Sequence, residues 1–108
     1  MDNVFKELPS MAITVSNKNG EIVDMNDRSV ATFGEGLIGK NLMDCHPERA
    51  KQVIASMIDN ASSNAYTIEK NGEKKLIYQT PYYKDGEFAG LVEFSIVIPA
   101  QMPHFVRE

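Results

Sequence analysis

The sequence predicts an α+β fold, in which five antiparallel strands form one sheet and short helices cover one of its faces. Three turn sequences, at residues 17–20, 70–72 and 84–86, each separate two strand-like segments. They contain Asn-Gly or Asp-Gly, which supplies the positive φ angles of tight hairpins. Apolar residues at helical spacing lie between the first hairpin and the other two. Helices packed on one face of an antiparallel sheet make a two-layer domain.

The five expected strands form an N-terminal pair and a C-terminal triplet. Ile13 and Val15 alternate with polar residues, as in a half-buried strand. The turns therefore place the strands at residues 11–16, 21–26, 65–69, 73–83 and 87–99.

The clearest expected helix precedes residues 60–64, whose sequence NASSN ends it. Its apolar stripe consists of Ala50, Val53, Ile54, Met57, Ile58 and Ala61. Shorter helical pieces are expected at residues 26–33 and 37–43. An N-terminal amphipathic helix is expected within residues 1–10, before a domain at residues 11–99 and a tail at residues 100–108.

Composition excludes several functional classes. The 108 residues suffice for one domain. A net charge of −4 without a basic stretch argues against nucleic-acid binding. The apolar runs are too short for a membrane span, and the N-terminus lacks a secretory signal. One cysteine excludes an internal disulfide and fits a cytoplasmic location.

The segment ITVSNKNGEIVDMNDRSVATFG, followed by GLIGKNL, resembles the first half of a PAS domain. Asn26 matches the turn asparagine of that family, Gly34 matches the glycine that ends the first helix, and residues 38–41 match the next helix. Residues 71–99 are similar to the final hairpins. The stretch around Cys45 is similar to a bacterial PAS subgroup with Cys-His-Pro at this point.

The resemblance implies a sheet with strand order 2-1-5-4-3 and a role in sensing and signal transduction. PAS domains hold a small ligand, a cofactor or nothing between sheet and helices, and they pass a change to a partner domain or dimer mate. The family architecture would turn the more apolar alternate set of the last strand toward the helices. The expected pocket residues are Phe33, Asn41, Leu42, Val53, Met57, Tyr66, Ile68, Tyr78, Val92, Phe94 and Ile96. The alternative is a core that fills itself and leaves no cavity.

The other face of the last strand is expected to carry Leu91 and Val97. Together with the apolar side of the N-terminal helix, at Val4, Phe5 and Leu8, this face predicts a homodimer or a complex with a signalling partner. A monomer that covers the face with its own helix is the alternative.

The stretch Cys45-His46-Pro47 has several interpretations. The favoured one is helix entry, with Asp44 or His46 as a cap and Pro47 supplying a preset φ. A redox thiol or a haem contact through His46 is the alternative, although His46 precedes the long helix. Flavin adduct chemistry lacks its flanking motif, and a metal site lacks ligands, because the only other histidine is His104 in the tail.

The sequence therefore favours a sensory module that binds a small ligand or dimerises, with a cofactor-based sensor using haem, flavin or a redox thiol as the alternative. No Ser-His-Asp order or phosphate loop indicates an enzyme. The strand and turn glutamates, Glu69, Glu73, Glu87 and Glu93, are expected on solvated surface. No cofactor or metal is specified.

Overall fold

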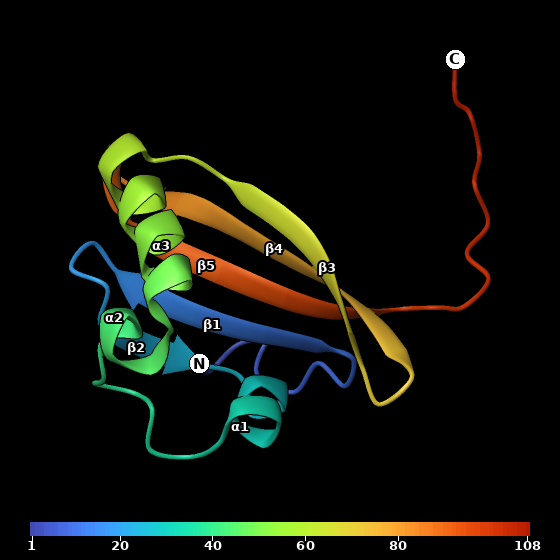
Figure 1. Ribbon diagram of the computed structural model, residues 1–108, viewed down its shortest axis with the longest axis horizontal. Helices are drawn as coiled ribbons and strands as arrows, with labels where there is room; N and C mark the ends of the chain where they lie inside the picture. The colour runs from blue at the N-terminus through green and yellow to red at the C-terminus, as the bar shows by residue number, and fades with distance from the viewer.

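All five strands lie in one antiparallel sheet of order β2-β1-β5-β4-β3, as expected (Figure 1). The computed structural model describes the 108 residues, except for the side chain of Cys45. Along the chain the elements are β1 (Met11–Asn17), β2 (Ile22–Met25), α1 (Asp27–Phe33), α2 (Leu42–Cys45), α3 (Glu48–Asn60), β3 (Asn64–Lys70), β4 (Glu73–Lys84) and β5 (Glu87–Ile98).

The three helices cover one face of the sheet (Figure 1). Ile54 and Met57 of α3 pack against Leu91 of β5 and form a buried cluster. Ile54 and Met57 of the predicted apolar stripe therefore face the sheet, whereas Val53 of the same stripe is exposed. The helix ends at Ala61, which adopts a left-handed conformation with φ of 48° and donates its N–H to the Met57 carbonyl oxygen.

The predicted turns connect the C-terminal strands. Asn71 and Gly72 have φ values of 54° and 79°, and Asp85 and Gly86 have 53° and 80°. Two consecutive positive φ angles are those of a type I′ turn, whose twist matches the flanking strands. The prediction of two hairpins in the C-terminal triplet is confirmed.

Asn26 links three segments at the start of α1 and is fully buried. Its Oδ1 accepts hydrogen bonds from the N–H groups of Ser29 (3.0 Å) and Ile13 (2.9 Å). Its Nδ2 donates to the carbonyl oxygens of Phe5 and Met11, both at 2.9 Å. One side chain therefore caps a helix and ties that helix to β1 and the N-terminal segment.

Residues 1–10 form turns instead of the expected N-terminal helix. The carbonyl oxygen of Phe5 accepts from Asn26, and that of Lys6 accepts from the N–H of Asp27 at 2.9 Å. Lys6 also pairs with the Asp27 carboxylate at 3.0 Å. These tertiary bonds use carbonyl groups that a continuing helix would need, so the segment docks on α1 without becoming helical.

Strand β5 passes very close to β1 at Gly90. A Cβ atom at this position, where φ is +154°, would lie 2.0 Å from the Ser16 carbonyl oxygen. Only glycine allows this approach, which brings the start of β5 against β1. Beyond β5 the tail runs away from the body (Figure 1). Within the described residues, no helix has the length and apolar character needed to cross a membrane.

Candidate functional site

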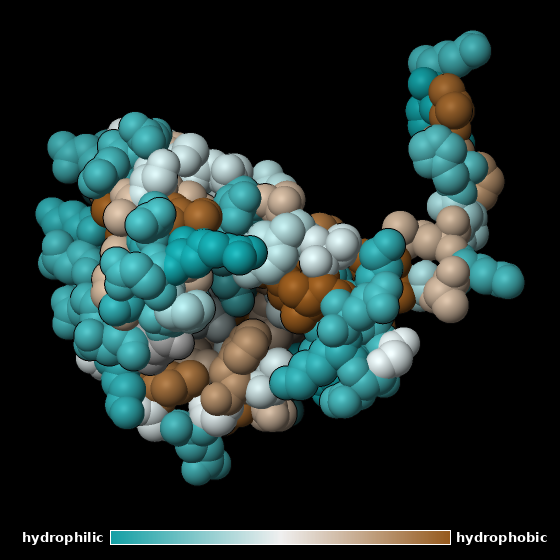
Figure 2. All heavy atoms as spheres, viewed as in Figure 1, coloured by the Kyte–Doolittle hydropathy of each residue, from teal (hydrophilic) through white to brown (hydrophobic). Residues whose placement is uncertain are grey.

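A cavity of about 310 Å³ lies between the sheet and the helices. Figure 2 shows a recess in this face of the molecule, with hydrophobic residues along its rim. The apolar side chains on the cavity come from the sheet, from all three helices and from the loop after α1. They are Ile22, Met25, Phe33, Leu37, Leu42, Ile54, Met57, Leu91 and Val92.

Five polar residues also line the cavity: Thr14, Ser16, His46, Gln79 and Glu93. Thr14 and Ser16 are alternate residues of β1 and lie opposite Glu93 and Leu91 in the sheet register. The Ser16 hydroxyl donates to the Leu91 carbonyl oxygen at 3.4 Å, and the Thr14 hydroxyl is paired with that of Ser29. The hydroxyl groups are therefore already bonded within the protein.

A chain of side-chain hydrogen bonds positions Glu93. Asn64 donates through Nδ2 to Gln79 Oε1 at 3.0 Å, and Gln79 donates through Nε2 to Glu93 Oε2 at 2.7 Å. Gln79 is only 8% exposed, so its amide is held on both sides. These two hydrogen bonds join directly opposite residues of β3, β4 and β5, and they fix the Glu93 carboxylate at the wall of the cavity.

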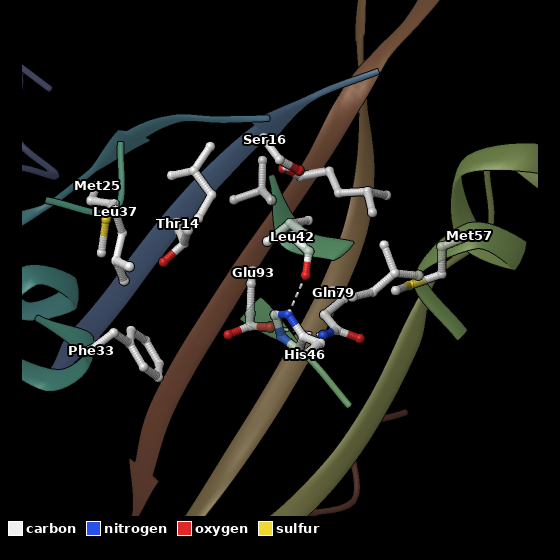
Figure 3. Close-up of a pocket in the computed structure, with 14 residues that line it drawn as sticks. Thr14, Ser16, Met25, Phe33, Leu37, Leu42, His46, Met57, Gln79 and Glu93 are labelled. Carbon is white, nitrogen blue, oxygen red and sulfur yellow. Dashed lines mark hydrogen bonds between the residues drawn. The ribbon is translucent and has the colours of Figure 1, made fainter. Parts of the chain in front are cut away.

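His46 contributes an imidazole to the same wall (Figure 3). Its Nδ1 lies 2.8 Å from the Leu42 carbonyl oxygen. A carbonyl oxygen only accepts, so Nδ1 of His46 donates this hydrogen bond. Figure 3 shows His46, Gln79 and Glu93 in the same part of the cavity.

Tyr66 lies near this polar group on β3. The pKa of Tyr66 is raised, first because partial burial disfavours the phenolate and second because the Glu93 carboxylate adds negative potential. The electrostatic influence of Glu93 therefore extends beyond the hydrogen bond that it accepts.

The two faces of β5 are the reverse of the sequence expectation. Leu91 and Glu93 face the helices, whereas Val92, Phe94 and Ile96 alternate with them and belong to the outer face. The sequence analysis expected the more apolar alternate set of β5 to face the helices. The structure places the set with the polar residue Glu93 there instead. Val92 borders the cavity between its two neighbours even though its side chain alternates outward.

Of the eleven expected pocket residues, Phe33, Leu42, Met57 and Val92 lie on the cavity. The others lie elsewhere for distinct reasons. Asn41 caps α2 through Met43 N and donates to the Asn19 carbonyl oxygen. Val53 is on the outer side of α3 and is 43% exposed. Tyr66 and Ile68 lie on β3, away from the cavity. The outer face of the sheet carries the remaining three expected residues, Tyr78, Phe94 and Ile96.

The sequence interpretation missed Glu93, which it assigned to solvated surface. The sequence did contain an indication of this role. Glu93 lies between apolar residues of a strand and is two residues from Leu91, so the two side chains share a face. An acidic residue on the helix-facing side needs a polar partner, and Gln79 lies opposite it in the register.

The expected dimer residues do not form one surface. Leu91 is buried in the core and Val97 shares its face, so neither belongs to the outer surface. Val4 and Phe5 are exposed, and Leu8 is half-buried in the N-terminal segment. The correction follows from the same reversal of the strand faces.

The stretch at residues 45–47 does lead into a helix, but not through the expected caps. Pro47 occupies the N-cap position of α3, and no side chain caps this end. His46 bonds to Leu42 instead. The Cys45 side chain, and with it the redox interpretation, lies outside the described residues. Among the described side chains, no group of three or more potential ligands is arranged to hold a metal ion.

The strand order, the helix-covered face and the cavity between them define the PAS fold. Solved structures with this fold include the PAS domain of histidine kinase ThkA, with a TM-score of 0.65 and 23% identity over 81% of this chain and 98% of that one. A sensory box sensor histidine kinase from Vibrio cholerae has a TM-score of 0.65 and 19% identity over 86% and 85%.

The Aer2 receptor from Vibrio cholerae, a dual PAS-heme oxygen sensor, has a TM-score of 0.59 and 16% identity over 83% of this chain and 96% of that one. No model of a known protein family matches the sequence, and no curated protein does. The structural similarity confirms the expected fold.

Proposed function

We propose that this chain is a PAS-type sensory module that binds a small molecule between its sheet and its helices. The observation that carries the proposal is the cavity of about 310 Å³, which has apolar walls and one fixed carboxylate. Ligand sites are typically apolar cavities with a few placed polar groups. A core that filled itself would leave no such space.

The volume of this cavity favours a ligand smaller than haem or flavin. An apolar cavity of about 150 Å³ holds one benzene molecule. Haem has roughly seven times as many non-hydrogen atoms as benzene, and flavin mononucleotide about five times as many, whereas the cavity of about 310 Å³ is only about twice as large. A small molecule therefore matches the cavity better than a group the size of haem.

Strand β5 offers a physical route by which occupancy changes the surface. Leu91 and Glu93 contact the cavity, and the intervening Val92 and the next residue, Phe94, belong to the outer face. A shift of this strand on ligand binding moves both faces together. The ligand signals to the extent that it binds two positions of the strand unequally.

The proposal is tested by native mass spectrometry of freshly purified protein, with and without added small aromatic and aliphatic molecules. The expected result is a mass increment from a bound small molecule. Leu37→Trp, which adds volume at the cavity wall, should abolish it. Ile38→Trp is the matched control, because Ile38 is the next residue of the same loop and is 55% exposed, outside the cavity.

A protein that binds none of these molecules would contradict the proposal. Equal loss of binding in the two tryptophan variants would also contradict it, since the ligand would then occupy another site.

A second function, self-association, is favoured by the outer sheet face. Tyr78 is 41% exposed there and lies directly opposite Phe94 in the register, with Leu76 and Ile96 as the next pair on the same face. An apolar row of this kind is suited to contact with a second copy of the chain. Output then passes through association, and a change in β5 alters the contact.

A further inference from the structure

The cavity presents a carboxylate oxygen that accepts no hydrogen bond from another described residue. One Gln79 N–H is donated to Glu93, and the Gln79 oxygen accepts from Asn64. The Ser16 hydroxyl donates to a backbone carbonyl, and the Nδ1–H of His46 does the same. Among the described side chains, Oε1 of Glu93 and Nε2 of His46 form no hydrogen bond with another residue.

The charge at this wall is negative and unpaired. Glu93 forms no ion pair with a described residue, and no lysine or arginine is among the residues that line the cavity. A cation that enters the cavity can pair with this carboxylate at its free oxygen. An anionic ligand would instead meet repulsion from Glu93.

The remaining walls set the size and character of the rest of the ligand. At about 310 Å³, the cavity has about twice the volume of one that holds benzene. Its other walls are mainly aliphatic, with methionines on two sides and Phe33 near the rim. They favour a compact hydrocarbon or aromatic body of about ten to fifteen non-hydrogen atoms.

We infer that the ligand of this cavity is a small protonated amine with an apolar body. Its ammonium group donates to Glu93 Oε1, while the body occupies the space between Leu42, Met57 and Leu91. This inference rests on the proposed function, because it names the chemical class of the molecule that the cavity binds.

The test compares three probes of matched size by NMR titration of the intact protein: phenethylamine, phenethyl alcohol and phenylacetate. The amine should bind at least about tenfold more tightly than the alcohol, because the ammonium and the Glu93 carboxylate carry opposite charges whereas the hydroxyl is neutral. Phenylacetate should bind more weakly than the alcohol. This comparison needs no variant, so it stands even if a substitution prevents folding.

Glu93→Gln should remove the preference for the amine over the alcohol. Glu87→Gln is the matched control, because Glu87 lies at the exposed start of the same strand. It should keep the preference.

The possible failures are distinguishable. If the alcohol binds in the cavity as tightly as the amine, or phenylacetate binds more tightly than either, the amine inference is wrong and the proposed function stands. If none of the probes perturbs resonances of cavity residues, both are contradicted. If Glu93→Gln keeps the amine preference, the ammonium does not contact Glu93 and the inference is again wrong.

Discussion

Gln79 and Glu93 lie opposite each other on β4 and β5, and the amide Nε2 of Gln79 donates to Oε2 of Glu93 at 2.7 Å. This bond holds a carboxylate on the helix-facing side of the sheet, where apolar side chains form most of the wall. Because Asn64 in turn fixes Gln79, the polar group is built by three adjacent strands. The proposed ligand recognition rests on this carboxylate.

Asn26→Ala should be among the most destabilising single substitutions in the chain. The change removes a helix cap and leaves the N–H of Ile13 and the carbonyl oxygens of Phe5 and Met11 without their partner. Loss of the cap costs about 1 kcal/mol and each buried unsatisfied group about 1–3 kcal/mol, so a total of at least about 3 kcal/mol is expected. Urea denaturation followed by circular dichroism measures it.

Asn41→Ala is the control for this substitution. Asn41 also caps a helix, but its second bond, to the Asn19 carbonyl oxygen, is exposed. Its replacement should cost no more than about 1 kcal/mol. Equal effects of the two substitutions would show that Asn26 acts only as a cap.

Gly90→Ala should disrupt the contact between β5 and β1. The added Cβ would lie 2.0 Å from the Ser16 carbonyl oxygen and 2.8 Å from the Asn17 Cα, and these are backbone atoms that cannot rotate away. Gly34→Ala is the control, because Gly34 has a φ of +108° and open space around it. Strain alone should cost the control about 1–3 kcal/mol, and Gly90→Ala should cost clearly more. Comparable unfolding midpoints would contradict the close approach.

Glu93→Gln should lower the pKa of Tyr66. Partial burial raises that pKa and the Glu93 carboxylate contributes to the rise, so removing the charge removes one of the two causes. Tyr66 is therefore more strongly protonated in the folded chain than in the unfolded one. Its contribution to stability is full below the unfolded tyrosine pKa of about 10 and is lost as the pH rises through the higher folded value.

The measurement is an ultraviolet titration of phenolate absorbance, with Tyr66→Phe used to identify the Tyr66 step. An unchanged Tyr66 titration in Glu93→Gln would mean that the Glu93 carboxylate does not influence the pKa of Tyr66.

Tyr78→Lys should weaken self-association by about tenfold or more, because it places a charge at the centre of the apolar outer face. Ile38→Lys is the control, since Ile38 is comparably exposed but lies on the loop beside the helices. Sedimentation velocity over a range of protein concentrations compares the variants with the unmodified chain. A monomer at all concentrations would contradict association through this face.

Much of the fold could be predicted because it depends on local chemistry. The turns at residues 70–72 and 84–86 need positive φ angles, and Asn-Gly and Asp-Gly supply them. The stripe of α3 follows from helical spacing. The N-terminal segment could not be predicted in the same way, since its apolar spacing is helical while its carbonyl groups bond to Asn26 and Asp27.

The cavity was harder to predict than the fold. Both alternate sets of β5 contain apolar residues, so hydrophobicity favoured Phe94 and Ile96 for the helix side. The structure places them on the outer face, because the helix-facing set combines Leu91 with Glu93 and Ser95. Which face is covered depends on the long-range packing of α3 against Leu91, which hydrophobicity along β5 does not specify.

The central claim is that a small molecule binds between the helices and the inner face of the sheet, and the most direct test is intermolecular NOE spectroscopy with methyl-labelled methionine. Met25 and Met57 line the cavity, whereas Met11 lies on the outer face and Met102 is exposed in the tail. The account predicts NOEs from bound phenethylamine to the methyl groups of Met25 and Met57 alone. NOEs to Met11 or Met102 without any to the cavity pair would contradict it.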